Sequence, residues 1–528
     1  MNAFTSIDAL QPGEDAAPFY APAPTDMLDG LMGQYQRARA QILAVDAIMT
    51  DRDHRAAVSY FIGGNRPQSR ISGELSVDSI FKLDGALAAL NADYWSRALA
   101  LTDVLDLMPQ ARRTEWQESI TNRTTPDFEE ETVRATLESL LSARGRFFAE
   151  RVDGIFRALS GTHVTNSPAA FGKRMIISYM TDANGFTNYA RAGFIHDLRA
   201  VIAKFMGRDE PKYAAAARLV EVARSNPGVW HEADGGALRL RSYKVGTAHL
   251  EVHPDMAWRL NAVLASLYPS AIPASFRTKP ARRAKGTVPM GRPLPFAVVE
   301  VLANGKFRQG EFHFGWGDES RSGPARDEAE LVISALGGVV ASRQGVATFD
   351  YDAAPIIQIV ILTGCLPDQK AHQYYPTPAT VAAAAVELAQ IGPDHQVLEP
   401  SAGQGHLAAL LPQERLTCVE LAPLHVQILR QRGFETVQGD FIRWAASAPR
   451  FDRVVMNPPF ADGRALAHLE AAAQLVEPGG RLVAVLPASM RGKDVLPGWT
   501  AEWSRVFANE FAGTSVAVAI VAADRPRS

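Results

Sequence analysis

The stretch Phe451-Asp452-Arg453-Val454-Val455-Met456-Asn457-Pro458-Pro459-Phe460 indicates most about the fold of this chain. Its apolar first part is typical of a buried strand of an α/β sheet. The tetrapeptide 457–460 then lies at the carboxyl end of that strand, where open α/β sheets bind ligands. Two prolines remove two N–H donors, so the carbonyls of Asn457 and Pro458 stay free as acceptors. A planar molecule with an exocyclic amino group suits such a site, with its ring on Phe460; a simple Pro-rich turn is the alternative.

A glycine-containing loop lies upstream of this stretch. The segment 395–400 predicts a strand, the loop 401–405 (Ser-Ala-Gly-Gln-Gly) follows, and the apolar spacing of 407–411 predicts a helix. Strand, glycine turn and helix open a dinucleotide-type βαβ unit, and glycines let the backbone approach a ligand closely. Phosphate is disfavoured as that ligand because no Lys or Arg lies in or next to the loop.

Acidic residues follow the next two predicted strands. The strand 416–420 ends in Glu420, about twenty residues after the glycine loop, where a ribose-binding carboxylate is expected. The segment 435–441 ends in Asp440 and Phe441, an acceptor for an adenine amino group and a face for its ring. Together these segments predict a site for an adenosine-containing cofactor.

These motifs resemble those of class I S-adenosylmethionine-dependent methyltransferases, in particular the amino-methyltransferases of DNA. The resemblance covers about residues 372–528 and implies a C-terminal Rossmann-like domain with a seven-stranded mixed sheet, whose last strand is antiparallel to its neighbours. It implies S-adenosyl-L-methionine as the cofactor, bound by Tyr375, Thr377, Pro378, Glu399, Pro400, Ser401, Ala402, Gly403, Gly405, Glu420, Leu421, Asp440, Phe441 and Asn457. It implies that the catalytic residues are Asn457, Pro458, Pro459 and Phe460.

The chemistry of methyl transfer suits this tetrapeptide. The acceptor is an aryl amine whose lone pair is delocalised into its ring, and acceptors at Asn457 and Pro458 localise it as nitrogen becomes tetrahedral. A base inside a duplex cannot reach such a site, so it flips out or is single-stranded, and Phe460 stacks on it. We therefore predict methylation of the N6 amino group of adenine in DNA. Methylation of RNA or of a protein glutamine is the alternative, although the glutamine enzymes' motif usually ends in Tyr. A non-catalytic nucleic-acid-binding or scaffold protein with this fold is another.

Composition limits the remaining possibilities. The chain has 528 residues, 47% of them hydrophobic and 21% charged, which is ample for two or three domains. Its net charge of -3 excludes a chain that is basic overall, so any DNA contact comes from a local patch. Two cysteines, Cys365 and Cys418, have no metal-ligand spacing, and no metal is expected. There is no apolar run long enough to span a membrane and no signal segment, so we expect a cytoplasmic protein that does not bind membranes, in an oligomeric state that the sequence leaves open.

Five regions follow from the pattern along the chain. Residues 1–25 are predicted to be a flexible leader, 26–270 a mainly helical domain of unknown function, 271–292 a basic linker, 293–365 a small α/β region and 366–528 the Rossmann-like domain. The helical domain contains a predicted hairpin over 238–252, and the small region is predicted to begin with a strand over 296–302.

The helical domain also resembles a known family. The stretches 151–161 and 166–168 are similar to a domain of unknown function that is fused to methyltransferases of bacterial phages, plasmids and integrated elements. This resemblance implies a bacterial protein encoded on a mobile element.

Candidate DNA contacts lie outside the methyltransferase segment. Fewer than seventy residues follow Phe460, and the last strands take up most of them, so we expect that the helical domain or a partner supplies sequence recognition, or that recognition is weak. The linker is a phosphate-contacting arm or a solvated segment, with the candidate residues Arg277, Lys279, Arg282, Arg283 and Lys285. Lys173 and Arg174 are a further candidate for a phosphate contact. The tryptophans Trp95, Trp116 and Trp230 are interpreted as core residues.

Overall fold

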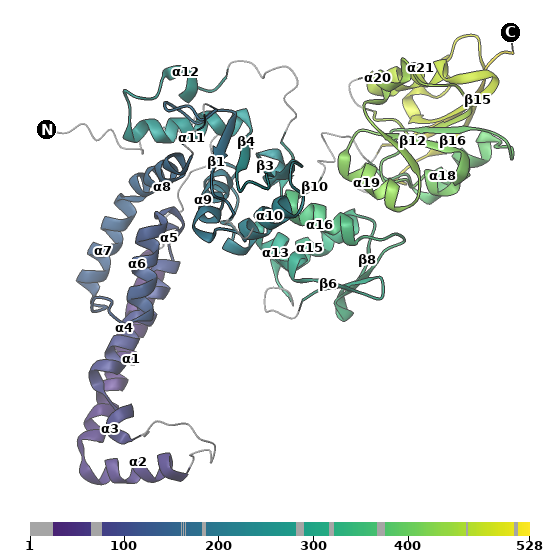
Figure 1. Cartoon of the computed structure of the whole chain (residues 1–528). Helices are drawn as coiled ribbons and strands as arrows, with labels where there is room; N and C mark the ends of the chain where they lie inside the picture. The colour runs from purple at the N-terminus through teal and green to yellow at the C-terminus, as the bar shows by residue number, and fades with distance from the viewer. Residues whose placement is uncertain are drawn as a thin grey trace. The chain divides into compact units, whose positions relative to one another are not determined.

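The chain folds into two compact units in a computed structural model (Figure 1). The structure describes residues 25–64, 76–159, 161, 163, 165–181, 186–280, 290–315, 322–366, 375–460, 463–511 and 516–527. One unit comprises Met1–Trp230 with Ala237–Thr287, and the other His231–Gly236 with Val288–Ser528. The predicted leader, apart from Thr25, lies outside the described residues. In the described ranges, no helix is both long and apolar enough to cross a membrane.

The first unit is mainly helical, as the sequence predicts. Its helices are α1 (Thr25–Thr50), α2 (Arg52–Gly64), α3 (Val77–Ile80), α4 (Leu83–Ala100), α5 (Val104–Leu107), α6 (Gln110–Thr121), α7 (Glu130–Ser142), α8 (Arg144–Ala158), α9 (Tyr189–Phe205), α10 (Tyr213–Ser225), α11 (Pro254–Leu267) and α12 (Ala274–Arg277). Trp95 of α4 is fully buried, packs edge-on against Phe128 and donates its indole N–H to the Pro126 carbonyl. The interpretation of Trp95 as a core residue is therefore confirmed.

A small antiparallel sheet completes the first unit. The predicted hairpin is confirmed as β3 (Leu238–Ser242) and β4 (Ala248–Val252). The sequence analysis missed β1 (Arg174–Ile177), which pairs with the other edge of β4. Alternate residues of β3 and β4 are buried, because one face of the sheet packs on helices such as α10.

The second unit begins with short elements around a core of their own. They are β2 (His231–Ala233), η2 (Asp234–Gly236), β5 (Arg292–Pro293), α13 (Phe296–Asn304), β6 (Lys306–Arg308), β7 (Glu311–His313), α15 (Pro324–Ala335), β8 (Val339–Ala341), η3 (Ser342–Gln344), β9 (Val346–Thr348), α16 (Ala354–Thr363) and β10 (Cys365–Leu366). Four of these strands form a sheet in the order β6-β7-β9-β8.

The predicted strand over 296–302 is wrong, because this segment is the helix α13. A short apolar run rich in valine has no periodicity that separates a strand from a buried helix. Pro295 immediately precedes the helix as its N-cap, and the residues Val298, Val299 and Leu302 are buried among α15 and α16. Tertiary packing decided the conformation here.

The remainder of the second unit is a three-layer α/β domain. Its elements are α18 (Ala379–Ala389), β11 (Val397–Pro400), η4 (Ala408–Leu410), η5 (Gln413–Arg415), β12 (Leu416–Glu420), α19 (Pro423–Gln431), β13 (Glu435–Gln438), α20 (Phe441–Ala445), β14 (Phe451–Met456), α21 (Arg464–Gln474), β15 (Val476–Pro487), η7 (Ala488–Met490), β16 (Thr500–Phe507) and β17 (Val518–Asp524). The seven strands run in the order β13-β12-β11-β14-β15-β17-β16. The first five are parallel, and β17 is antiparallel to both neighbours, so the expected seven-stranded mixed sheet is confirmed.

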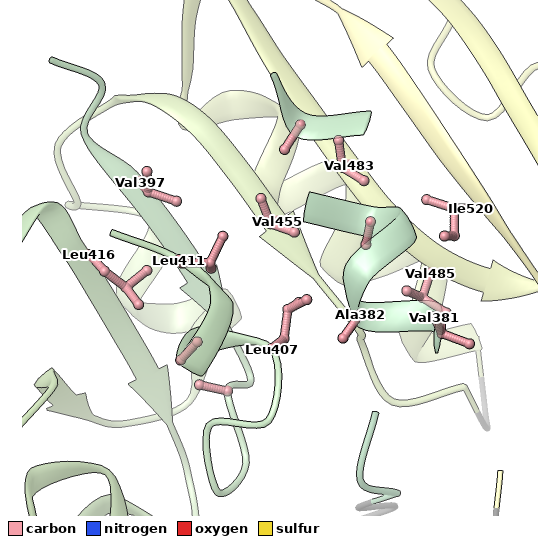
Figure 2. Close-up of a cluster of buried hydrophobic side chains, with 14 of the residues drawn as sticks. Val381, Ala382, Val397, Leu407, Leu411, Leu416, Val455, Val483, Val485 and Ile520 are labelled. Carbon is pink, nitrogen blue, oxygen red and sulfur yellow. The ribbon is translucent and has the colours of Figure 1, made fainter. Parts of the chain in front are cut away.

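Apolar side chains cover both faces of this sheet. On one face, Val397, Val455 and Val483 pack with α18 and with the segment after the glycine loop (Figure 2). On the other face, Leu398 and Val454 and their neighbours pack with α21. Strands buried on both faces read as continuous apolar runs, which is the pattern found in the sequence.

The helix predicted directly after the glycine loop is absent from the structure. Only one 3₁₀ turn, η4, forms there, and Leu407 and Leu411 pack into the core beside it. Pro412 follows at once and lacks an N–H donor, and the segment between Gly405 and Pro412 is too short for a stable helix. The glycine loop is therefore held by packing and not by a helix N-terminus.

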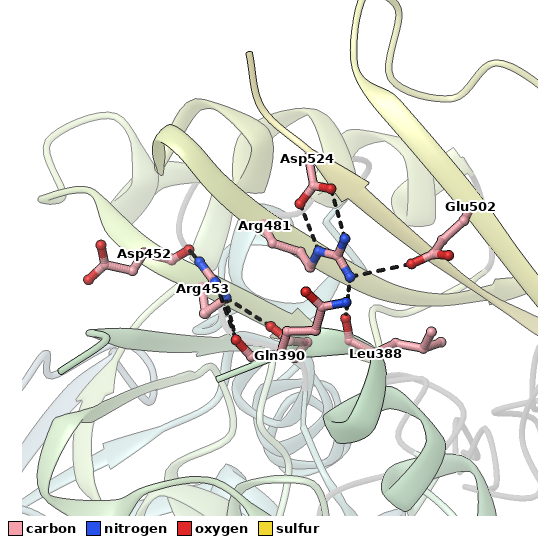
Figure 3. A network of polar contacts seen from close by, with 8 residues as sticks. Leu388, Gln390, Asp452, Arg453, Arg481, Glu502 and Asp524 are labelled. Atoms are coloured by element: carbon pink, nitrogen blue, oxygen red, sulfur yellow. Dashed lines mark hydrogen bonds and ion pairs between the residues drawn. The ribbon is translucent and has the colours of Figure 1, made fainter. Parts of the chain in front are cut away.

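Two arginines fasten the C-terminal end of α18 to the sheet (Figure 3). Arg453 of β14 donates to the carbonyls of Ala389 and Gln390, at 2.8 and 3.2 Å. Arg481 of β15 donates to the Leu388 carbonyl and binds Asp524 through two bonds of 2.7 Å. Cationic side chains at a helix C-terminus donate hydrogen bonds to its free carbonyls and interact favourably with the negative end of the helix dipole. The segment 375–378, which precedes α18, is thereby held next to the sheet.

Candidate cofactor and acceptor site

A cavity of about 910 Å³ lies at the carboxyl ends of β11, β12, β13 and β14. The sequence predicts ligand binding at this edge of the sheet. Most of the predicted site residues line the cavity, namely Tyr375, Thr377, Glu399, Ser401, Ala402, Glu420, Leu421, Asp440, Phe441, Asn457, Pro458, Pro459 and Phe460. The structure thus brings together four strand ends and the segment before α18.

Four predicted site residues, Pro378, Pro400, Gly403 and Gly405, are not part of the cavity wall. Pro378 is the N-cap of α18, and Pro400 is buried at the end of β11. Gly403 and Gly405 have positive φ of 58° and 87°. A Cβ atom at Gly405 would meet Leu429 at 2.8 Å, so only glycine fits this turn. These residues shape the loop, whereas Ser401 and Ala402 line the cavity.

Glu420 is fixed at the cavity wall by the backbone. Its two carboxylate oxygens accept hydrogen bonds from the N–H groups of Gly403 and Ala422, at 2.9 and 2.7 Å. Burial alone would raise the pKa of Glu420, but His425 at 3.7 Å and these two N–H groups lower it below its ordinary value. Glu420 is therefore an ionised acceptor in a fixed orientation, which suits the vicinal hydroxyls of a ribose.

Glu399 lies beside it in a different electrostatic state. Its side chain is fully buried, and burial together with the charge of Glu420 raises its pKa well above the ordinary value. Among the described residues, no donor reaches its Oε2 atom. A buried carboxyl oxygen without a partner, in the wall of a cavity, is suited to a cationic or donor group of a ligand.

Asn457 is oriented by a residue far away in the chain. Its Nδ2 donates to Thr377 Oγ1 at 3.0 Å. With the amide nitrogen engaged, Oδ1 remains as the acceptor of this side chain, and both Asn457 and Pro458 line the cavity. Phe460 is half-buried and packs against the apolar clusters on both faces of the sheet, which fixes its ring at the cavity wall.

Asp440 has a structural role that the sequence analysis missed. Its Oδ1 accepts the Arg443 N–H at 3.0 Å and caps α20. The second carboxylate oxygen makes no hydrogen bond to the described residues and faces the cavity region. Phe441 is buried, and its ring packs on that of His468 with centroids 5.5 Å apart.

Several cavity residues were not foreseen, in particular His406, His425, Arg464, His468 and Phe511. His468 of α21 contacts Ser401 Oγ through Nδ1 at 3.2 Å, and burial lowers its pKa. Single histidines and a lone arginine carry no motif, so no signal in the sequence could have identified them. Arg464 is exposed at the cavity and adds a positive charge there.

The small α/β region braces the glycine loop from outside. Gln404 donates from Nε2 to the Ala335 carbonyl at 2.8 Å, and its own carbonyl accepts from Arg432. Arg432 also binds Asp350 at 2.9 Å and lies over the Tyr351 ring. Residues of the loop, of α15 and of the segment after β9 therefore form one polar cluster.

Two of the five candidate linker residues are described by the structure. Arg277 ends α12 and is half-buried, and Lys279 is exposed; both belong to the first unit. Arg282, Arg283 and Lys285 lie outside the described residues. Their part in DNA binding stays a prediction.

Comparisons with known proteins add a match for the first unit. Residues 87–270 match the family model described as a domain of unknown function (DUF4942), which agrees with the resemblance of this segment to such a domain. No curated protein matches the chain. Because the family model covers about a third of the chain, it leaves the activity open.

Similar solved structures are methyltransferases of several kinds. TrmN from Thermus thermophilus is 22% identical, with 28% of this chain and 48% of that chain aligned and a TM-score of 0.24. A putative RNA methyltransferase from Pyrococcus horikoshii is 19% identical over 30% and 91%, with a TM-score of 0.25. The 23S rRNA methyltransferase ErmE is 20% identical over 29% and 72%, with a TM-score of 0.25. The chain spans about half the length of TrmN. The fold assignment rests on the strand order of the sheet and not on these alignments.

Proposed function

We propose that the second unit transfers a methyl group from S-adenosyl-L-methionine to the exocyclic N6 amino group of adenine in DNA. The observation that carries this proposal is the bond between Asn457 Nδ2 and Thr377 Oγ1, in the wall of a cavity that Pro458, Pro459 and Phe460 also line; this bond leaves the Asn457 side-chain oxygen as an acceptor for the amine. An amine with two N–H groups, attached to a flat ring, is complementary to that arrangement.

The residues around the cavity fit the cofactor. Glu420 is an ionised, fixed acceptor for the ribose hydroxyls. The unpartnered oxygen of Glu399 suits the ammonium group of the methionine moiety, with Tyr375 and Thr377 nearby in the wall. Leu421, Asp440 and Phe441 surround a place for the adenine ring. The bound cofactor supplies a methyl group that is activated by its attachment to a sulfonium. Once it has lost this methyl group, the sulfur is a neutral thioether.

The chain's own residues act on the acceptor. The Asn457 oxygen and the Pro458 carbonyl accept hydrogen bonds from the two N–H groups of the amine. These two bonds keep the lone pair on nitrogen and direct it toward the methyl carbon. These hydrogen bonds strengthen as nitrogen gains positive charge, so they stabilise the transition state more than the ground state. The N–C bond forms as the S–C bond breaks, and the nitrogen then releases one proton to water. No strong base is required.

Two features favour a nucleic-acid base over a protein glutamine as the acceptor. Phe460 offers an aromatic face for a flipped or unpaired base, and the tetrapeptide ends in Phe and not in the Tyr usual for glutamine methylation. Arg464 lies exposed at the same cavity and can contact a phosphate next to the flipped base.

Incubation with methyl-labelled cofactor and separate DNA, RNA and protein substrates tests the proposal, with nucleoside analysis of the product. We expect N6-methyladenine in DNA. Asn457→Ala is expected to lower the rate by on the order of 10²–10³-fold, since one lost transition-state hydrogen bond has this effect, while cofactor binding stays near that of the wild type. Labelled RNA or protein without labelled DNA would disprove the substrate, and full activity of Asn457→Ala would disprove the assigned role.

A further inference from the structure

The half-exposed face of the sheet in the first unit carries positive charge. Along β3, Leu238, Leu240 and Ser242 are buried, whereas Arg239 and Arg241 alternate with them and remain half-exposed. Arg174 lies opposite Glu251 on β4, and Glu251 lies opposite Arg239, so these side chains share one face. In the same way Arg241 lies opposite His249.

One tryptophan stands among these arginines. The guanidinium carbons of Arg241, Arg239 and Arg174 lie 4.6, 5.2 and 5.7 Å from the centroid of the Trp230 ring. Trp230 is partly buried, in contrast to the fully buried Trp95, so it is not a fully buried core residue. The strand register groups the three arginines on one face, within reach of its ring.

A second aromatic residue extends this group. Arg241 also lies over the Tyr243 ring, at 5.1 Å, and the Tyr243 and His249 rings are 4.6 Å apart. Arginine planes next to half-exposed aromatic rings are the components with which proteins hold unstacked bases and their phosphates.

The charged groups of this face differ in their partners. Glu251 is bound to Arg174 at 2.6 Å and to Arg239 at 3.5 Å. No carboxylate of the described chain forms an ion pair with Arg241, and its buried Nε atom has no hydrogen-bond partner there. Burial lowers the pKa of His249, and Arg241 and Arg174 lower it further, as expected in a positive surrounding.

We infer that this face, made of Arg174, Trp230, Arg239, Arg241 and Tyr243, is a DNA-binding surface. Arg241 and its neighbours neutralise phosphates, and the rings of Trp230 and Tyr243 contact bases of an unpaired or distorted strand. Naming DNA rests on the proposed function of the second unit. The surface supplies the DNA contact that the chain needs, because the chain as a whole is acidic, with a net charge of -3.

The test measures binding without cofactor, so that it is independent of methyl transfer. Fluorescence anisotropy of labelled single-stranded DNA, the matching duplex and an RNA strand is followed with the full chain over a series of salt concentrations. The variants are Arg241→Gln, Arg241→Lys and Trp230→Ala. Arg146→Gln is the control, because Arg146 is an exposed arginine of α8, 53% exposed and paired with Glu150 at 3.3 Å. Circular dichroism melting checks that each variant folds.

We expect Arg241→Gln to weaken DNA binding and to lower the slope of log affinity against log salt by about 0.7 for single strands and about 0.9 for duplex. Arg241→Lys should keep that slope, and Trp230→Ala should weaken single-strand binding by roughly tenfold. Arg146→Gln should match the wild type. If Trp230→Ala unfolds, the two Arg241 variants decide.

Each remaining outcome has one meaning. If the folded variants bind DNA like the wild type, this face is not a DNA-binding surface, even if the wild type methylates DNA. Arg241-dependent DNA binding by a chain that methylates no nucleic acid leaves the surface standing and overturns the proposed function. Arg241-dependent binding to an acidic peptide or to phosphatidylserine vesicles, without DNA binding, overturns DNA as the partner.

Discussion

The side-chain amide of Asn457 donates to the hydroxyl of Thr377 at 3.0 Å, across 80 positions of the chain. Thr377 precedes α18, and the C-terminal end of that helix is fastened to the sheet by Arg453 and Arg481. The orientation of the first residue of the tetrapeptide is therefore set by a segment outside the motif.

Thr377→Val should lower kcat for methyl transfer by about fivefold while cofactor affinity changes little. A hydrogen bond of this type contributes about 1 kcal/mol, and its loss lets the Asn457 amide rotate. Thr377→Ser keeps the hydroxyl and is the matched control. Steady-state kinetics, with calorimetry of cofactor binding, checks this. Equal kcat in the valine and serine variants would contradict the orienting role.

Glu420→Gln should weaken cofactor binding by at least tenfold. Hydrogen bonds to a charged acceptor contribute about 1.5–3 kcal/mol, and an amide NH₂ at this position also opposes the N–H of Gly403 or Ala422. Glu435→Gln, on the exposed edge strand β13, is the control. Titration calorimetry measures both affinities, and unchanged binding by Glu420→Gln would remove this residue from the ribose site.

Glu399→Gln should become more stable relative to the wild type as the pH rises. Burial and Glu420 raise the pKa of Glu399 in the folded chain well above the unfolded value of about 4.3, so the folded chain holds a proton that the unfolded chain releases. The stability contributed by this proton is complete below about pH 4 and is lost as the pH rises toward the folded pKa. Glutamine does not titrate.

Thermal melting of both proteins between pH 5 and 8 checks this difference, with Glu435→Gln as the control. The gain in melting temperature of Glu399→Gln should grow across the range. A constant gain, or none, would show that Glu399 titrates normally in the folded chain. Cofactor binding by the variant should weaken, because an amide that cannot ionise replaces the carboxyl group proposed to meet the ammonium group.

Arg432→Met should lower the free energy of unfolding by about 1.5–3 kcal/mol, the size of hydrogen bonds to a charged donor. It should also weaken cofactor binding severalfold, because Arg432 holds the Gln404 carbonyl of the glycine loop and Asp350 of the small α/β region. Arg430→Met, on the exposed side of the same helix, is the control. Urea unfolding and cofactor titration measure the two effects. Loss of stability with unchanged cofactor affinity would limit Arg432 to a structural role.

The sequence by itself determined the elements whose pattern is local. Continuous apolar runs predict strands buried on both faces, and alternation over 238–252 predicts a hairpin; both are present. The sequence also predicted that Asn457, Glu420 and Asp440 lie at the ends of their strands. Side chains that follow parallel strands meet at one edge of the sheet. Their grouping around one cavity follows from this rule.

Tertiary structure decided what depends on distant partners. The segment 296–304 is a helix because its apolar residues pack between α15 and α16, and no local period favours either state. Trp230 is partly buried against three arginines, which the register of β1, β4 and β3 groups on one face. His425 and His468 reach the cavity only through the packing of α19 and α21. Such contacts join residues far apart in the chain, so no motif within a single segment predicts them.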